Sequence, residues 1–269
     1  MATVLRSSLL VSSLLLNSEA WVNLTDKDIR GLEQTDEILL SKVTESEANT
    51  SNTFKYLELG ILPLRFEIMK KKFLFLQYVL KQDKSSMIYR VFNATRENPI
   101  KNDFVQICEK YLKSLDIELS FRDIELMGNW QFKNLVKEKV KVAGFKYLIE
   151  LQKKQSKILH IQYTSLEMQE YLLAGNKNID VSKFIFKARS QNLDIKTQKK
   201  WKFEDKACVG CNVREETGQE ILTCWYFGAD ELTKPLTYDM FYGGLSDMVM
   251  VATCMMQKLK TRQSILDDG

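Results

Sequence analysis

The sequence predicts a mainly α-helical protein, in which helical bundles are followed by a small cysteine-containing knuckle and a C-terminal helix. Only three prolines and eleven glycines occur in 269 residues, which favours long uninterrupted helices over a turn-rich β-sandwich. Apolar residues recur at three- and four-residue steps over several long stretches. Cysteines cluster at Cys208, Cys211 and Cys224. The chain is long enough for one large or two ordinary domains, and its 45% apolar residues can supply a buried core.

The first half of the chain contains several helix start signals. The apolar pattern over 5–16 suits a buried helix or strand. Thr25 and Asp28 have the spacing of a capping box at the start of a helix. Asn102 and Ser120 are predicted to cap two later helices. Helices are therefore expected over 26–43, 64–80, 86–96, 102–115 and 120–127, with a polar loop over 44–53.

The second half begins with a long amphipathic helix, expected over 131–154, whose polar face carries many lysines. A shorter helix is expected around 183–189, and a further short helix is expected to begin at Gly218. Met248, Val251, Met255 and Leu259 follow helical spacing and predict a C-terminal helix over 246–266, with the methionines in its core face.

The charge distribution is uneven along the chain. Residues 131–206 contain seventeen Lys/Arg and eight Asp/Glu, whereas the segments before and after carry net charges of −1 and −4. A basic centre of this kind is typical of a segment that binds a polyanion. The alternative is that the lysines solvate the outer faces of long helices. The candidate phosphate contacts are Lys133, Lys137, Lys141, Arg189, Lys199, Lys200 and Lys202, and the candidate base-stacking residues are Trp201 and Phe203.

The cysteine cluster predicts a zinc knuckle. Cys208, Cys211 and Cys224 supply three thiolates, and Glu220 supplies a carboxylate as the fourth ligand. Since His160 is the single histidine, a site with several histidine ligands is excluded. Two alternatives remain open at this point. One is a metal-free knuckle filled by the aromatic residues at 225–227, and the other is a redox pair of the first two cysteines.

The first twenty residues resemble a secretory signal peptide, with a basic start, an apolar stretch and small residues around Ala20. A secreted helical interaction protein is therefore an alternative function. It would make Asn23, Asn49 and Asn93 candidate glycosylation sites. No stretch approaches the length of apolar sequence that a transmembrane helix needs.

The order of several motifs resembles the region that follows the catalytic palm in reverse transcriptases of non-LTR (LINE-like) retrotransposons. The resemblance extends over 5–267. It rests on the motifs at Leu14–Trp21, Leu24–Val43, Tyr56–Arg65 and Phe184–Arg189 and on the cysteine knuckle. It implies a thumb-like helical region over 1–128, a basic helical linker over 129–206, and a knuckle with a C-terminal helix over 207–269.

The resemblance also implies a function, with two departures. It implies a nuclear or cytoplasmic module that grips the backbone of template–primer or target RNA or DNA, and that works beside the palm and fingers of the same polymerase. The family's knuckle histidine falls at Glu220, which puts zinc binding in doubt. The metal-binding aspartates of the palm are missing, because the pair Asp267-Asp268 lies at the end of a helical pattern. The chain alone is therefore expected to have no polymerase activity. A further alternative is an inert relic that folds poorly.

Overall fold

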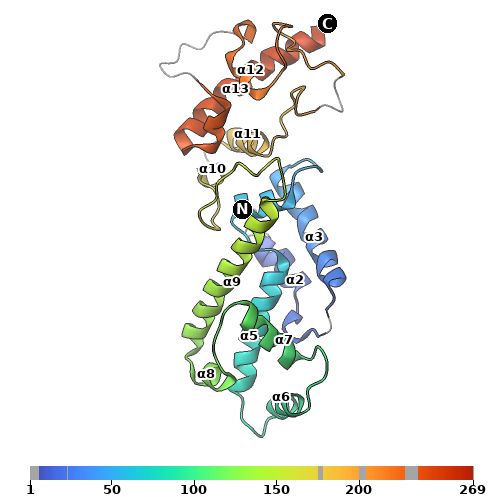
Figure 1. Cartoon of the computed structure of the whole chain (residues 1–269), viewed down its shortest axis with the longest axis vertical. Helices are drawn as coiled ribbons and strands as arrows, with labels where there is room; N and C mark the ends of the chain where they lie inside the picture. The colour runs from blue at the N-terminus through green and yellow to red at the C-terminus, as the bar shows by residue number, and fades with distance from the viewer. Residues whose placement is uncertain (1–5, 23, 175–177, 200–203, 228–235, 269) are drawn as a thin grey trace. The chain divides into compact units, whose positions relative to one another are not determined.

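The protein is described by a computed structural model that covers residues 6–22, 24–174, 178–199, 204–227 and 236–268. The structure is mainly helical, which confirms the predicted fold class (Figure 1). None of the described helices combines the length and the apolar character needed to cross a membrane. The chain divides into two compact units, each of which is described by itself.

Unit 1 consists of residues 1–43 and 61–151. Its core is formed by apolar side chains from α5, α7 and α9, among which Phe73, Cys108 and Phe132 have no exposed surface. The helices of unit 1 are α2 (Ser12–Leu14), α3 (Asp26–Thr44), α5 (Leu64–Leu80), α6 (Met87–Glu97), α7 (Phe104–Ser114), α8 (Phe121–Leu126) and α9 (Asn129–Gln152), preceded or joined by short helical turns at Arg6–Val11 and Ser18–Ala20.

Local capping determines where several of these helices begin. The Thr25 hydroxyl accepts a hydrogen bond from the Asp28 amide at 3.2 Å, and the Asp28 carboxylate accepts one from the Thr25 amide at 2.9 Å. Ser120 and Asp123 form the same reciprocal arrangement at the start of α8. The predicted cap at Asn102 is wrong. Asp103 caps α7 by accepting from the Gln106 amide at 2.8 Å, while Asn102 has a left-handed φ of 61°.

The N-terminal segment is part of unit 1. The guanidinium of Arg6, which is 4% exposed, donates two hydrogen bonds of 2.6 Å to the Asp36 carboxylate on α3. It also donates to the Leu62 carbonyl at 2.8 Å. Leu15 is fully buried, and its carbonyl accepts a hydrogen bond from the Lys71 ammonium on α5. The apolar stretch that resembles a signal peptide is therefore packed against α3 and α5.

Unit 2 consists of residues 44–60 and 152–269, so one of its helices comes from the first quarter of the chain. That helix, α4 (Asn52–Leu59), is buried on most sides, and the ring of Phe54 lies 4.9 Å from that of Phe186. The other helices of unit 2 are α10 (Glu170–Ala174), α11 (Ile179–Arg189), α12 (Gly218–Thr223) and α13 (Leu245–Asp268), with short 3-10 turns at Trp225–Phe227 and Tyr238–Tyr242.

Gly60 ends α4 with a left-handed φ of 63°, where a Cβ atom would come within 2.3 Å of the backbone of Glu167 and Met168. Only glycine therefore allows the chain to leave α4 so close to the 167–168 segment. The Gln169 amide donates to the Glu58 carbonyl at 2.9 Å and fixes the same approach.

The boundaries of the two units do not coincide with the three predicted regions, 1–128, 129–206 and 207–269. The region 129–206 is split, because α9 belongs to unit 1 and the residues after 151 belong to unit 2. The region 1–128 is interrupted, because α4 lies in the core of unit 2.

Candidate metal centre and nucleic-acid interface

The cysteine knuckle is built from a tight turn and a short helix. Cys208 and Cys211 lie on the turn, which is closed by a 2.8 Å hydrogen bond from the Asn212 amide to the Cys208 carbonyl. Glu220 lies on α12, where Thr217 caps the helix and accepts from the Glu220 amide at 3.0 Å. Cys224 follows the last residue of α12. The predicted short helix from Gly218 is confirmed, and it brings the carboxylate and the third thiol to the turn.

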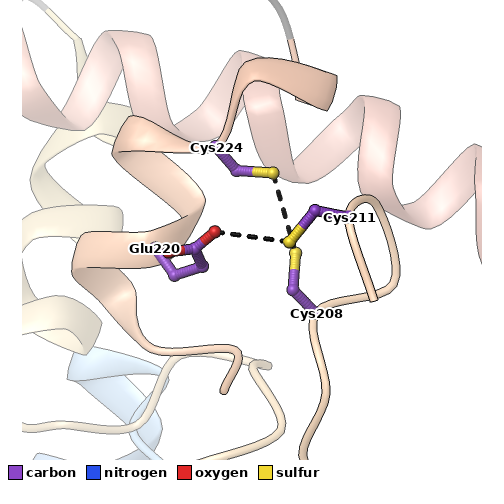
Figure 2. A group of neighbouring side chains, drawn as sticks. All are labelled: Cys208, Cys211, Glu220 and Cys224. Atoms are coloured by element: carbon purple, nitrogen blue, oxygen red, sulfur yellow. Dashed lines mark hydrogen bonds between the residues drawn. The ribbon is translucent and has the colours of Figure 1, made fainter. Parts of the chain in front are cut away.

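The ligand atoms of these four residues converge on one point (Figure 2). One ligand atom from each of Cys208, Cys211, Glu220 and Cys224 lies within 4.8 Å of all the others. The sulfurs of Cys208 and Cys224 are 3.9 Å apart, and the Cys211 sulfur is 3.5 Å from Glu220 Oε1. Sulfur ligands of a tetrahedral zinc ion, each at about 2.3 Å, are separated by about 3.8 Å. The chain thus forms a Cys3Glu cluster with metal-binding spacing.

The thiols of the cluster have different acidities. Burial raises the pKa of the Cys208 thiol to about 11. The backbone amides of Val213 and Arg214 lower the pKa of the Cys211 thiol. Without a cation, Cys208 therefore keeps its proton at neutral pH. A bound metal ion would favour the thiolate and release that proton.

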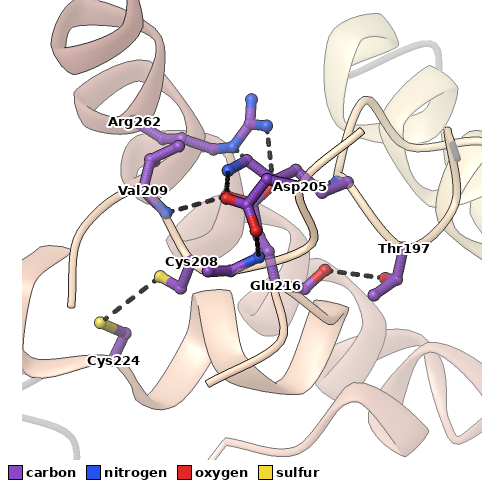
Figure 3. A network of polar contacts seen from close by, with 9 residues as sticks. Thr197, Asp205, Cys208, Val209, Glu216, Cys224 and Arg262 are labelled. Carbon is purple, nitrogen blue, oxygen red and sulfur yellow. Dashed lines mark hydrogen bonds and ion pairs between the residues drawn. The ribbon is translucent and has the colours of Figure 1, made fainter. Parts of the chain in front are cut away.

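A buried ion pair between Glu216 and Arg262 contacts the 208–211 turn (Figure 3). Glu216 is fully buried, and its Oε1 accepts hydrogen bonds from Arg262 Nε at 2.9 Å and Nη2 at 2.6 Å. The same oxygen accepts from the Lys196 amide at 2.9 Å, and Oε2 accepts from the Val209 amide at 3.4 Å. Because Val209 lies between the first two cysteines, Glu216 connects the metal-ligand turn to α13.

Gly210 is required by packing at the same turn. A Cβ atom at this position would lie 2.9 Å from the Tyr226 side chain and 3.1 Å from the ring of Phe227. Phe227 is buried, so two of the aromatic residues predicted to fill a metal-free knuckle do lie against the turn. They form part of its wall, and the four ligand atoms still converge on one another.

The predicted nucleic-acid contacts have different surroundings. Lys133 and Lys137 are exposed on α9, and Lys141 is half-buried on the same helix. The predicted candidates Lys200, Trp201, Lys202 and Phe203 lie outside the described residues. Among the described residues, the three candidate phosphate contacts Lys133, Lys137 and Lys141 thus lie on α9 in unit 1.

Two of the predicted phosphate contacts are corrected by the structure. Arg189 is 2% exposed and forms an ion pair of 2.9 Å with Glu58, and its Nη1 donates to the Phe241 carbonyl at 2.7 Å. Lys199 is 3% exposed and is paired with Glu47. Both cations are used inside unit 2, so neither is available to a phosphate group.

These pairs change the interpretation of the basic centre of the sequence. Lys183, Arg189 and Lys199 are paired with Glu45, Glu58 and Glu47, which all come from 44–60. By sequence, unit 2 contains eighteen basic and eighteen acidic residues, whereas unit 1 contains twenty-one basic and seventeen acidic residues. The net charge of +4 therefore belongs to unit 1. Sequence reasoning missed this balance because the partners are more than 130 residues apart.

Glu58 is also the centre of a network that the sequence did not reveal. The hydroxyls of Tyr163 and Tyr171 each donate to its carboxylate at 2.5 Å. Burial raises the pKa of both tyrosines well above its ordinary value, and the neighbouring Glu58 carboxylate adds to the effect. Glu58 is thereby satisfied on both oxygens although it has no exposed surface.

Comparison of the chain with models of protein families, with curated proteins and with solved structures finds no match.

Proposed function

We propose that this chain is a nucleic-acid-binding module that holds RNA or DNA through the phosphate backbone, and that a zinc ion stabilises its unit 2. The function is of the kind implied by the resemblance to the region after the palm of non-LTR reverse transcriptases. There the module would act beside the palm and fingers of the same polymerase. The packing of the N-terminal segment bears on the alternative of a secreted interaction protein.

The observation that carries the proposal is the exposed basic face of α9. From Lys133 to Lys146 this helix carries five lysines and one acidic residue, Glu138. The excess positive charge of the chain also lies in unit 1, to which α9 belongs. Lysines on a rigid helix suit contacts with phosphates that do not depend on base sequence, because such contacts position the nucleic acid without reading it.

The cysteine cluster supports a structural zinc ion. Three thiolates and a carboxylate make a closed four-ligand set, as in structural rather than catalytic zinc sites. The guanidinium of Arg214 lies 3.6 Å from Glu220 and offsets part of the negative charge. When bound, the ion would cross-link the 208–211 turn to α12.

The packing of the N-terminal segment favours its retention. A secreted protein cleaved after Ala20 would lose Arg6 and Leu15, and the fully buried carboxylate of Asp36 would lose its ion-pair partner. Breaking a buried ion pair by removing one of its partners is strongly destabilising. The observations therefore support the nucleic-acid-binding function over the secreted alternative.

The binding function is tested by filter binding to RNA and DNA at several salt concentrations. The double variant Lys133→Gln/Lys137→Gln should weaken binding, and should reduce the slope of log affinity against log salt by about 1.4 to 1.8. Lys110→Gln/Lys113→Gln is the matched control, since it removes two exposed lysines from α7 of the same unit. Binding that is absent or insensitive to salt in the unaltered chain would refute the proposal.

The zinc ion is tested by elemental analysis of the purified protein. One equivalent of zinc is expected in the unaltered chain and a large loss in Cys208→Ser. Cys108→Ser should keep its zinc, because Cys108 lies in the core of unit 1. Equal zinc content in the two variants would contradict the assignment.

A further inference from the structure

Trp130 is the most unusual side chain on the surface of unit 1. It lies in the first turn of α9 and is 75% exposed. Tryptophan is the largest apolar side chain and is highly buried on average, whereas here it is presented to solvent beside a row of lysines. Leu126, three residues before the first residue of α9, is also 75% exposed. Two large apolar side chains are thus exposed close in sequence at the N-terminal end of a basic helix.

The lysines of α9 are aligned with this tryptophan. At 100° per residue, Lys133, Lys137 and Lys141 lie within about 60° of Trp130 around the helix axis. Successive lysines in this row are four residues apart, which corresponds to a rise of about 6 Å. The row therefore consists of one aromatic ring followed by three lysines, and it is about 17 Å long.

The other charges near this row leave it positive. Glu138 is exposed on α9, about 80° from Trp130 around the helix axis and three residues before Lys141, so the row has three cations beside one carboxylate. The ammonium of Lys139 lies outside the row and donates to the Asp116 carbonyl at 3.3 Å. The ammonium of Lys81 lies at the Trp130 end, where it donates to Met127 O and to Asn129 Oδ1, each at 2.7 Å. An aromatic ring next to a row of cations is complementary to a base next to its phosphates.

We propose that Trp130 stacks on an unpaired base of a single-stranded nucleic acid, whose phosphates follow Lys133, Lys137 and Lys141. This inference rests on the proposed function and names the class of nucleic acid bound by the same helix. A single strand is required because the faces of bases within a duplex are covered by their neighbours. Indole stacking tolerates any base, so the site has little sequence preference.

The test uses the full chain, titrated with fluorescently labelled oligothymidylate and oligouridylate and with a duplex of the same length. Trp130→Ala and Trp130→Leu should each weaken single-strand binding by about 5- to 100-fold, and Trp130→Phe should restore part of it. Duplex binding should change less than about twofold, and the salt slope should be unchanged, because no phosphate contact is lost. Leu126→Ala is the matched control, as it removes an equally exposed side chain without a π face.

A second readout separates stacking from general apolar contact. Tryptophan fluorescence should be quenched as the single strand saturates the unaltered chain, and Trp130→Phe should lose that part of the quenching. Near-ultraviolet circular dichroism establishes that each variant is folded, as expected for a side chain that is mostly in solvent.

The outcomes distinguish the two proposals. If the unaltered chain binds no nucleic acid, the proposed function fails. If it binds and the lysine variants weaken binding while Trp130→Leu binds normally, the function stands and the stacking inference is overturned. Equal weakening of single-strand and duplex binding also overturns it. So does a loss of self-association in Trp130→Leu without a change in nucleic-acid binding, which would assign the surface to a second copy of the chain.

Discussion

At the scale of single residues, the carboxylate of Glu58 holds together the buried polar groups of unit 2. It binds Arg189 and accepts from Tyr163 and Tyr171, so it joins α4 to segments that are more than 100 residues away. Every polar group of this network has a hydrogen-bond partner. Removal of one side chain leaves its partners buried without one, which destabilises the fold by more than the net contribution of a single hydrogen bond. The sequence signal for it, a glutamate in an apolar helix, is too general to identify it.

Glu58→Gln should therefore lower the free energy of unfolding by about 3 to 5 kcal/mol, because it leaves the Arg189 guanidinium buried without a counter-charge. Glu45→Gln is the matched control, since the Lys183–Glu45 pair of the same segment is exposed and should contribute far less to stability. Urea unfolding monitored by circular dichroism measures both. Equal effects of the two variants would show that burial does not govern these pairs.

The two tyrosines predict a pH dependence. Their pKa values are raised in the folded state, so above about pH 10 the unfolded chain binds fewer protons than the folded chain. The free energy of unfolding should accordingly fall as pH rises above about 10, and these groups should have no effect below that pH. Urea unfolding at pH 8 and pH 10.5 measures the fall, which should be smaller in Tyr171→Phe. An identical fall in the variant would exclude this origin.

At the scale of secondary-structure elements, α13 acts as the support of the knuckle. Arg262 reaches Glu216, and the Lys258 ammonium donates to the Leu222 carbonyl on α12 at 2.7 Å. Through these contacts one helix fixes both the 208–211 turn and the helix that carries Glu220. Arg262 is thus a positioning residue, which acts on the ligands through Glu216.

Arg262→Gln should weaken zinc affinity by roughly 10- to 100-fold, which is the usual effect of losing a group that orients metal ligands. Competition with a fluorescent chelator measures the affinity, and Arg262→Lys should recover part of it. Lys260→Gln, on an exposed position of α13, should bind zinc normally. Unchanged zinc affinity in Arg262→Gln would show that the Arg262–Glu216 ion pair does not position the metal ligands.

The N-terminal segment is an element of unit 1 with a measurable role. A chain lacking residues 1–20 should lose at least about 3 kcal/mol of unfolding free energy, because the deletion breaks the buried ion pair between Arg6 and Asp36. Adding Asp36→Asn to the shortened chain should recover part of that loss, since it removes the charge that Arg6 balances. Thermal and urea unfolding give the comparison. A shortened chain as stable as the full one would revive the signal-peptide interpretation.

The elements that could be predicted from sequence are those with local signals. The range Leu64–Leu80 for α5 follows from Pro63 and a stretch rich in Phe, Ile, Met and Leu, and α3 follows from the Thr25–Asp28 capping box. The Cys3Glu ligand set was predicted because its members lie close in sequence. The burial of Arg189 could not be predicted, because its partner precedes it by 131 residues and no spacing rule connects them.

At the scale of the whole molecule, the chain passes from unit 1 to unit 2, back to unit 1 and again to unit 2. Unit 2 is consequently discontinuous, and its core contains α4. A fragment comprising only 152–269 would lack the fully buried side chains of Phe54 and Glu58. Leu57, also fully buried, would be missing as well.

We expect the 152–269 fragment to show helical circular dichroism but no fixed tertiary structure. Adding a peptide of residues 44–60 should restore near-ultraviolet circular dichroism, because the peptide supplies the missing core helix. The same peptide with Glu58→Gln is the control and should restore it far less. A fragment that folds cooperatively by itself would show that α4 is dispensable for unit 2.

The place of α4 in the fold also affects how the chain folds during its synthesis. A ribosome adding about 5 to 20 residues per second makes Arg189 roughly 7 to 26 s after Glu58, since 131 residues separate them. The helix therefore leaves the ribosome long before its core partners exist, while its apolar side chains still face solvent. During that interval the apolar side chains of α4 lack the partners that bury them in the folded chain, and slower translation beyond Gly60 should lengthen their exposure.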